Sequence, residues 1–251
     1  MLHPRTLIGA TVALGVLLGF LWLNRSAPVA PIICPQAEQF PTQRSSGYTT
    51  SFALLENPIA EGGNWINGRA VGIEWNNVET VSGVALGTQD ARTKQGSSAY
   101  DDSVALLTGT WNSDQSVEAT VRSTRERDDV YQEVELRLRS SLSSHCASGY
   151  EINFRCSKSV NAYTEIVRWN GRVGDFTYLN RLTGTKAGVG NGDVVKASII
   201  GNVLRAYVNG VEVLQAIDDT YANGNPGIGF YLRGEGGRNS DCGFTRLAAG
   251  L

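Results

Sequence analysis

The sequence predicts an all-β domain, a two-sheet antiparallel sandwich, over residues 48–251. Strand-like segments recur with turn signals roughly every eight to twelve residues, and helix signals are scarce. The 29 glycines suit a chain made of turns, and an apolar content of 41% with 18% charged residues is typical of a globular protein. About 200 residues form one sandwich more readily than two small domains.

Residues 1–25 are predicted to be a signal anchor or a signal peptide. Arg5 and the free amino group precede Leu7 to Leu23, a stretch without a charge, which is the pattern of an export segment. About seventeen apolar residues are at the short limit for a membrane span. Residues 26–47 hold four of the seven prolines and are predicted to be a Pro-rich linker. We expect an extracytoplasmic protein, membrane-anchored by its N-terminus or secreted if the signal is cleaved.

Four cysteines follow the export segment: Cys34, Cys146, Cys156 and Cys242. An even number in an exported protein favours disulfides. If residues 150–156 form a strand, its ends lie ~20 Å apart, so a bond between Cys146 and Cys156 is disfavoured. We therefore expect Cys242 to pair with one of these two.

Two consecutive segments in the middle of the chain alternate between apolar and polar residues. In Val130–Arg139 the apolar face carries Val134, Leu136 and Leu138, and the polar face carries Glu133, Glu135, Arg137 and Arg139. In Tyr150–Cys156 the apolar face carries Ile152 and Phe154, and the polar face carries Glu151, Asn153 and Arg155. Strands joined by a short connection usually pair, so the two polar faces should form one patch.

Further strands are predicted on both sides of short turns. Residues 162–169 and 176–182 are two strands separated by Asn170-Gly171, and later strands cover residues 193–200, 203–208, 211–216, 227–232 and 242–247. Asn209-Gly210 is a strong signal for a two-residue hairpin turn.

This C-terminal half resembles the concanavalin A-like lectin/glucanase superfamily, including its laminin-G-like members. The resemblance is carried by Gly192–Ala197, Arg205–Val213, Asp218-Asp219 and Asn225–Gly229, and it extends over residues 160–247. It implies a concanavalin A-like jelly roll and places lectins, glucanases and polysaccharide lyases among the similar proteins. Such motifs specify the fold and not the activity.

The polar patch is the first candidate site. Retaining glucanases of this fold carry Glu-x-Asp-x-x-Glu on one strand, whereas Glu133–Arg137 supplies two acids and no third at that spacing, so the motif is absent. We expect the patch to contact a substrate through Glu135, Arg137, Asn153 and Arg155. The alternative interpretation is a solvated sheet face with cross-strand ion pairs.

Sugar recognition requires flat aromatic surfaces beside planar polar groups. Tyr163, Glu165 and Trp169 share one strand face, and Tyr178 lies on the next strand, so these four are candidate substrate contacts. The alternative is that the aromatic residues belong to the core. A lyase would need a base, for which His145, Tyr150 and Tyr163 are weak candidates, and a cation such as Arg137 or Arg155 to hold a sugar carboxylate.

Other classes of function are disfavoured. A net charge of −2 supplies no basic surface for nucleic acid, and no Walker loop, zinc spacing or serine-nucleophile elbow is present. No cofactor or catalytic metal is expected, although the aspartate pairs at 101–102, 128–129 and 218–219 would suit a structural Ca²⁺.

The favoured function is an extracytoplasmic glycan-binding, lectin-like domain with a polysaccharide or glycan as its partner. The alternative is a polysaccharide-degrading enzyme, a lyase or glycoside hydrolase, that acts on an acidic glycan. A further alternative is a structural or protein-interaction domain that uses a sheet edge, as laminin-G-like domains can.

Overall fold

A computed structural model of the chain describes Cys34 and residues 47–90 and 101–251. The predicted export segment and all of the predicted linker except Cys34 and Gly47 lie outside these residues. Within the described ranges, no helix has both the length and the apolar composition that a membrane span requires. The helical elements described there are short 3-10 turns: η1 (Glu61–Gly63), η2 (Gly68–Val71) and η4 (Asn239–Asp241).

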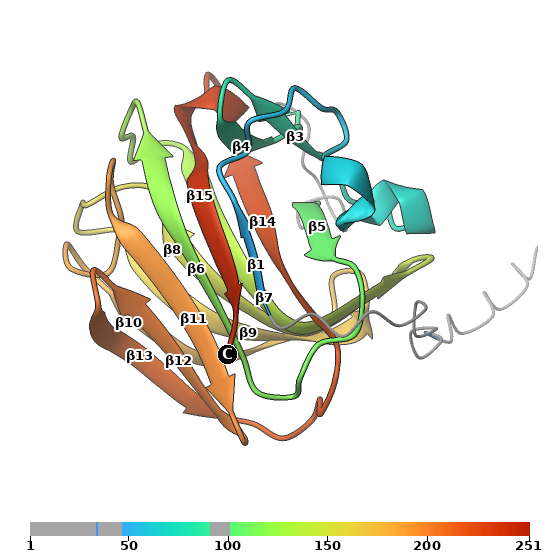
Figure 1. Cartoon of the computed structure of the whole chain (residues 1–251). Helices are drawn as coiled ribbons and strands as arrows, with labels where there is room; N and C mark the ends of the chain where they lie inside the picture. The colour runs from blue at the N-terminus through green and yellow to red at the C-terminus, as the bar shows by residue number, and fades with distance from the viewer. Residues whose placement is uncertain (1–33, 35–46, 91–100) are drawn as a thin grey trace, which may run out of the picture. The chain divides into compact units, whose positions relative to one another are not determined.

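Two antiparallel sheets form the domain (Figure 1). The first sheet has the order β13 (Val211–Ile217), β12 (Val203–Val208), β11 (Val194–Ile200), β6 (Gln115–Ser123), β15 (Cys242–Gly250), β4 (Val84–Gly87) and β3 (Val78–Val81), with β1 (Gly47–Thr50) also paired to β15. The second has the order β10 (Phe176–Thr183), β9 (Tyr163–Arg172), β8 (Cys146–Arg155), β7 (Tyr131–Ser143), β14 (Asn225–Arg233), β5 (Ser103–Leu107) and β2 (Trp65–Asn67). The predicted two-sheet sandwich is confirmed.

The main hydrophobic core lies between the sheets, and the alternation of the strands decides which side chains enter it. The apolar faces of β7 and β8 are fully buried there, through Val134, Leu136, Leu138, Ile152 and Phe154. From the first sheet, β6 adds Val117, Ala119 and Val121. Each large apolar side chain removed from water contributes about 1.5–3 kcal/mol. The polar faces of β7 and β8 must therefore point away from the core.

The predicted hairpin at Asn209-Gly210 is confirmed, and the turn predicted at Asn170-Gly171 is wrong. Asn209 and Gly210 have φ values of 53° and 79°, as a type I′ turn requires. Gly171 instead stays within β9, where it pairs with Ala147. A Cβ atom at position 171 would lie 2.9 Å from the Cys34 sulfur. This glycine therefore allows a close approach of another segment and does not make a turn.

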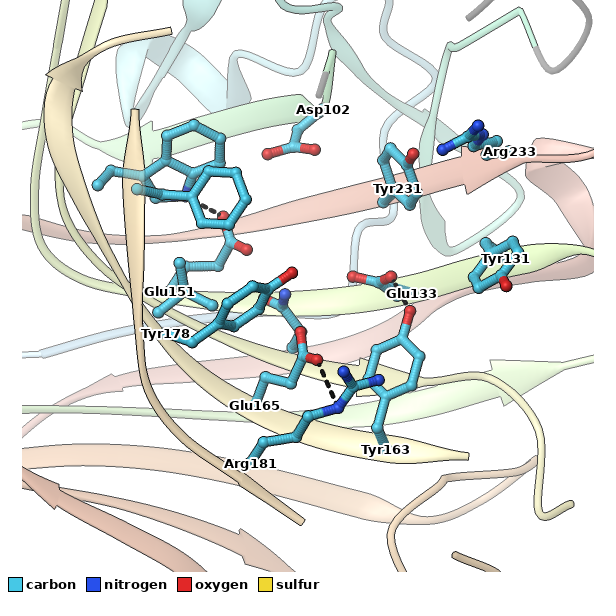
Figure 2. A pocket seen from close by; sticks show the side chains of 14 residues that line it. Asp102, Tyr131, Glu133, Glu151, Tyr163, Glu165, Tyr178, Arg181, Tyr231 and Arg233 are labelled. Atoms are coloured by element: carbon cyan, nitrogen blue, oxygen red, sulfur yellow. Dashed lines mark hydrogen bonds and ion pairs between the residues drawn. The ribbon is translucent and has the colours of Figure 1, made fainter. Parts of the chain in front are cut away.

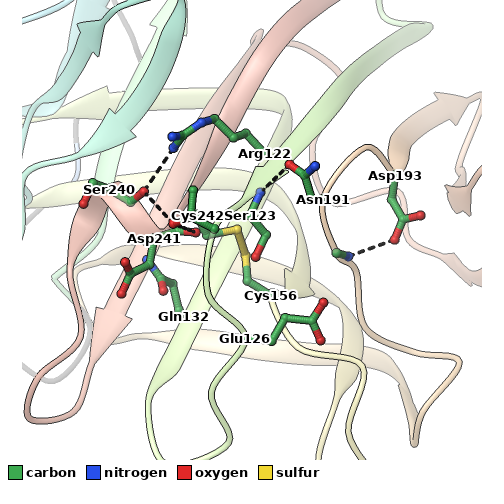
Figure 3. Close-up of a disulfide and its surroundings, with 12 residues drawn as sticks. Arg122, Ser123, Glu126, Gln132, Cys156, Asn191, Asp193, Ser240, Asp241 and Cys242 are labelled. Atoms are coloured by element: carbon green, nitrogen blue, oxygen red, sulfur yellow. Dashed lines mark hydrogen bonds between the residues drawn. A yellow bond between two sulfur atoms is a disulfide. The ribbon is translucent and has the colours of Figure 1, made fainter.

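Two disulfides hold the domain. Cys156 is bonded to Cys242, which joins the end of β8 in the second sheet to the start of β15 in the first (Figure 3). Cys34 is bonded to Cys146 at the start of β8. The expected participation of Cys242 is confirmed. Cys146 and Cys156 cannot meet, because β8 extends without a break over the residues between them.

Candidate functional site

A pocket of about 270 Å³ lies on the face of the second sheet that points away from the core. Strands β7, β8, β9, β10 and β14 contribute to it, together with Asp102 just before β5, and we call it the β7–β10 pocket. Its volume is slightly below the usual range for sites that enclose a drug-sized ligand. The pocket therefore suits one small molecule or one unit of a longer chain.

Strand register brings the polar residues of this face together. Glu135 pairs with Asn153 across β7 and β8, and Asn153 pairs with Glu165 across β8 and β9. Directly paired side chains on one face lie close enough to interact. The expected polar patch is therefore present, but Arg139 is not part of it. A register shift after Leu138 turns Arg139 away, and its guanidinium donates hydrogen bonds to the carbonyls of Ser113, Tyr221 and Gly201. The patch is not a solvated face, however, because Glu135 and Arg137 are only 1% and 2% exposed.

A buried arginine lies beneath the pocket. The Arg137 guanidinium forms ion pairs with Asp102 at 2.8 Å, with Glu135 at 2.5 Å and with Glu151, and we call these four residues the Arg137 cluster. The Cζ atom of Arg137 lies 5.0 Å from the ring centroid of Trp75. A buried charge is stable only when it is paired and hydrogen-bonded, and the three carboxylates supply those partners.

The Arg137 cluster also fixes the aromatic wall of the pocket. The indole nitrogen of Trp169 donates a hydrogen bond of 2.6 Å to Glu151. The same indole packs edge-on against Trp75, with ring centroids 4.7 Å apart, and at a tilt against Phe176, with ring centroids 5.2 Å apart. Trp169 is consequently held in one orientation from three sides.

Glu133 and Glu165 line the pocket together with Asp102 and Glu151 of the Arg137 cluster (Figure 2). The Tyr163 hydroxyl donates a hydrogen bond to Glu133, and Arg181 pairs with Glu165 at 2.9 Å. Burial raises the pKa of Glu133 to about 8, and the charges of Glu165, Glu151 and Asp102 add to that rise against the opposing Tyr163 hydrogen bond. Burial also raises the pKa of Glu165. Glu133 is therefore largely a neutral acid at neutral pH.

Two tyrosines at the borders of the pocket present their rings to solvent. Tyr131 is 51% exposed and Tyr178 is 55% exposed, and Figure 2 shows them on opposite sides of the acids. Tyr178 stands edge-on against Phe176 with ring centroids 5.2 Å apart. An exposed, supported ring is the surface on which a sugar ring stacks.

Five of the predicted substrate contacts line the pocket: Asn153, Tyr163, Glu165, Trp169 and Tyr178. Glu135 and Arg137 lie beneath it. Arg155 is also buried, and its guanidinium donates hydrogen bonds to the carbonyls of Asp128 and Val130 at 3.2 and 2.8 Å. These three residues shape the pocket from below and do not line it.

The other two lyase candidates are not at the pocket. His145 is exposed, and its Nδ1 atom shares a hydrogen bond with the Glu74 carboxylate. Tyr150 lies on the core face of β8, where its hydroxyl donates a 2.7 Å hydrogen bond to Asp218. Tyr163 does line the pocket, but burial and the neighbouring Glu133 raise the pKa of its hydroxyl, which opposes a role as a base.

Several lining residues were not among the predicted substrate contacts: Asp102, Glu133, Glu151, Arg181, Tyr231 and Arg233. Glu133 and Glu151 were on the predicted polar faces. Tyr231 alternates with the buried Phe230 and Leu232 on β14, so strand alternation could have found it. Asp102 precedes a distant strand, and no local pattern indicates that it reaches this face.

The carboxylates of Asp102, Glu135 and Glu151 lie within 4.8 Å of one another, close enough to hold a metal ion. The Arg137 guanidinium already contacts all three. The spacing therefore fits the arginine, and a structural Ca²⁺ stays a prediction without a site here.

No protein-family model matches the sequence, and no curated protein matches it significantly. Among the solved structures with a similar fold, three have a TM-score of 0.52. A β-glucanase of Bacillus licheniformis is 8% identical and aligns over 82% of this chain and 99% of its own. A prokaryotic β-1,3-1,4-glucanase (lichenase) from a mouse hindgut metagenome is 11% identical, with the same coverage of 82% and 99%.

The third structure is the carbohydrate recognition domain of Emp46p, which is 11% identical and aligns over 81% of this chain and 100% of its own. At such low identity the likeness concerns the fold. The chain therefore has a concanavalin A-like jelly-roll fold, as the sequence resemblance implied.

Proposed function

We propose that this chain is an extracytoplasmic glycan-binding protein whose binding site is the β7–β10 pocket. The observation that carries the proposal is the position of two half-exposed rings, Tyr131 and Tyr178, at the borders of a pocket lined by acids and an amide. A sugar ring stacks on such rings while its hydroxyls bond to planar polar groups.

Two further facts support the proposal. The solved structures with this fold include a carbohydrate recognition domain and two glucanases. Two disulfides, Cys34–Cys146 and Cys156–Cys242, are consistent with an oxidising compartment outside the cytoplasm. Anchoring to the membrane by residues 1–25 is part of the same proposal.

A glycan array probed with the full-length protein tests this function. We expect binding to a subset of oligosaccharides, and we expect Tyr178→Ala to weaken it roughly two- to tenfold because a stacked ring is lost. Tyr207→Ala on β12 of the first sheet is the matched control and should bind as the wild type does. An array without signal, from neutral and acidic glycans alike, would favour the protein-interaction alternative.

One observation favours a second candidate, glycoside hydrolysis. Glu133 has a pKa of about 8 and lines the pocket beside Glu165, so a protonated acid and a second carboxyl group share one space. Hydrolysis of a glycosidic bond uses such a pair. If the chain is a hydrolase, reducing ends should appear from a bound polysaccharide, and Glu133→Gln should abolish their release. Binding without product would support the lectin-like function alone.

A further inference from the structure

Strand register divides the pocket face of the β9–β10 hairpin into two parts. The part next to the hairpin turn carries apolar and aromatic side chains that are directly paired across the two strands: Trp169 with Phe176 and Val167 with Tyr178. Two residues farther along β9, Glu165 is paired with Arg181 and forms an ion pair with it. Directly paired side chains on one face of a sheet are neighbours. One end of the β7–β10 pocket is therefore apolar, and charged groups begin beyond it.

Phe176 and Tyr178 form a corner at this apolar end. Their ring planes are inclined at 88° with centroids 5.2 Å apart, and both side chains line the pocket. Tyr178 is 55% exposed and Phe176 is half-buried. A sugar ring stacks with its C–H face against an aromatic ring. A sugar that stacks on Tyr178 therefore turns its rim, and not its face, toward Phe176, because the two aromatic rings are nearly perpendicular.

The side chains that meet this rim offer it no hydrogen bond. Phe176 and Val167 carry neither a donor nor an acceptor in their side chains, and the single N–H of the Trp169 indole already donates a 2.6 Å hydrogen bond to Glu151. A hydroxyl group placed against these three side chains loses water without gaining a partner, which is unfavourable. A methyl group in the same place removes apolar surface from water, which is favourable.

We propose that the β7–β10 pocket selects a sugar unit whose rim carries a methyl group, as an N-acetyl or a 6-deoxy sugar does, over the same unit without that group. The sugar ring stacks on Tyr178, and the methyl group lies in the corner against Phe176. Hydroxyls on the opposite rim reach Glu165 and Arg181, which are planar polar groups of the kind that orient a ligand. The inference rests on the proposed glycan-binding function and names the class of sugar.

Isothermal titration of the full-length protein with two matched pairs of ligands tests the inference. The first pair is a β-1,4-linked oligomer of 2-amino-2-deoxyglucose in its N-acetyl and N-formyl forms, which differ only by the methyl group. The second pair is L-fucose and L-galactose, which differ only by the hydroxyl on carbon 6. We expect the methyl-bearing member of a pair to bind about three- to tenfold more tightly, because one small apolar group leaves water. The pair that responds shows whether the methyl group belongs to an acyl or to a deoxy sugar.

Two variants with side chains of similar size assign the preference to the corner. Phe176→Leu keeps an apolar wall and should keep most of the preference. Phe176→Asn supplies an amide that bonds to hydroxyls, so the ratio of the two affinities should fall toward one. Phe176 is half-buried on β10, at the edge of the second sheet, so both variants should fold, and urea midpoints check this. The comparison of ligands on the wild-type protein stands whether or not a variant folds.

The outcomes separate the inference from the proposed function. Equal or tighter binding of the methyl-free member in both pairs, or array signals confined to glycans without a methyl-bearing unit, would overturn the inference and leave glycan binding intact. A preference that persists unchanged in Phe176→Asn would overturn its assignment to the corner. No binding of any of the four ligands would also overturn the inference, and together with a silent array it would contradict the proposed function as well.

Discussion

Gly229 of β14 lies directly opposite Glu135 of β7, and a Cβ atom at position 229 would lie 2.1 Å from the Glu135 carboxylate. Gly229 belongs to the Pro-Gly-Ile-Gly segment on which the resemblance to concanavalin A-like domains rests. In this chain the glycine has a local task, because it leaves the space in which Glu135 reaches Arg137. Gly229 thus belongs to the fold motif and also leaves room for the ion pair beneath the pocket.

Gly229→Ala should therefore destabilise the protein. The added methyl group forces the Glu135 carboxylate away from Arg137, and overpacking of this kind costs about 1–3 kcal/mol. Urea denaturation measures the free energy of unfolding. The double variant Gly229→Ala, Glu135→Ala should recover part of the loss, since the clashing carboxylate is gone. If Gly229→Ala is as stable as the wild type, the Glu135 carboxylate does not fill the space beside Gly229.

Arg137→Met should lower the free energy of unfolding by about 3–5 kcal/mol, because it leaves the carboxylates of Glu135, Glu151 and Asp102 buried without their cation. Methionine keeps much of the apolar stem, so the effect reports the lost charge. The control is Arg246→Met, an exposed position on β15. Equal stabilities of the two variants would refute the buried ion-pair arrangement.

Stability should fall as the pH rises from about 5 to 8. The pKa of Glu133 is raised from 4.5 to about 8, so in this window the folded protein keeps a proton that the unfolded chain has lost. The contribution of protonated Glu133 to the free energy of unfolding is complete below pH 4.5 and is lost as the pH rises through 8. Burial raises the pKa of Glu165 as well, which adds to the same trend.

Urea midpoints measured across this pH range check the trend, with Glu133→Gln as the comparison. The amide cannot ionise, so the variant should show a clearly shallower dependence on pH than the wild type. Identical slopes would mean that Glu133 is not the buried, protonated acid described here.

The Cys156–Cys242 bond should matter for stability because it links the two sheets across 86 residues of sequence. Its removal by paired alanine substitutions should cost about 2–5 kcal/mol. Peptide mapping without reductant should find this pair and the Cys34–Cys146 pair. A peptide that joins Cys146 to Cys156 would contradict the continuous β8 strand.

Strand alternation and short connections predicted much of this fold and part of the site. They assigned Asn153 to the polar face of its strand and grouped Glu165 with Tyr163 and Trp169, and all four residues line one pocket. The same alternation implies that Tyr150 shares a face with Ile152. That second fact could have excluded Tyr150 from the site. Alternation separates the two faces of a strand, but it does not show whether the polar face is covered.

The burial of Glu135 and Arg137 could not be read from their own strand. Their partners include Asp102 and Trp75, which reach the cluster from distant segments, and Gly229 leaves room for it from β14. These contacts depend on the order of the strands in the sheet. The sequence resemblance implied the fold that contains this order but not which side chains meet across it.

Hydrogen–deuterium exchange of the full-length protein, with and without the oligosaccharide that binds most strongly on the array, tests the location of the site most directly. A glycan in the β7–β10 pocket should slow exchange in β9 and β10 and around residues 131–133 of β7. Strands β11–β13 of the first sheet serve as an internal control and should not change. Protection confined to the first sheet, or absent despite saturating ligand, would contradict the pocket as the glycan-binding site.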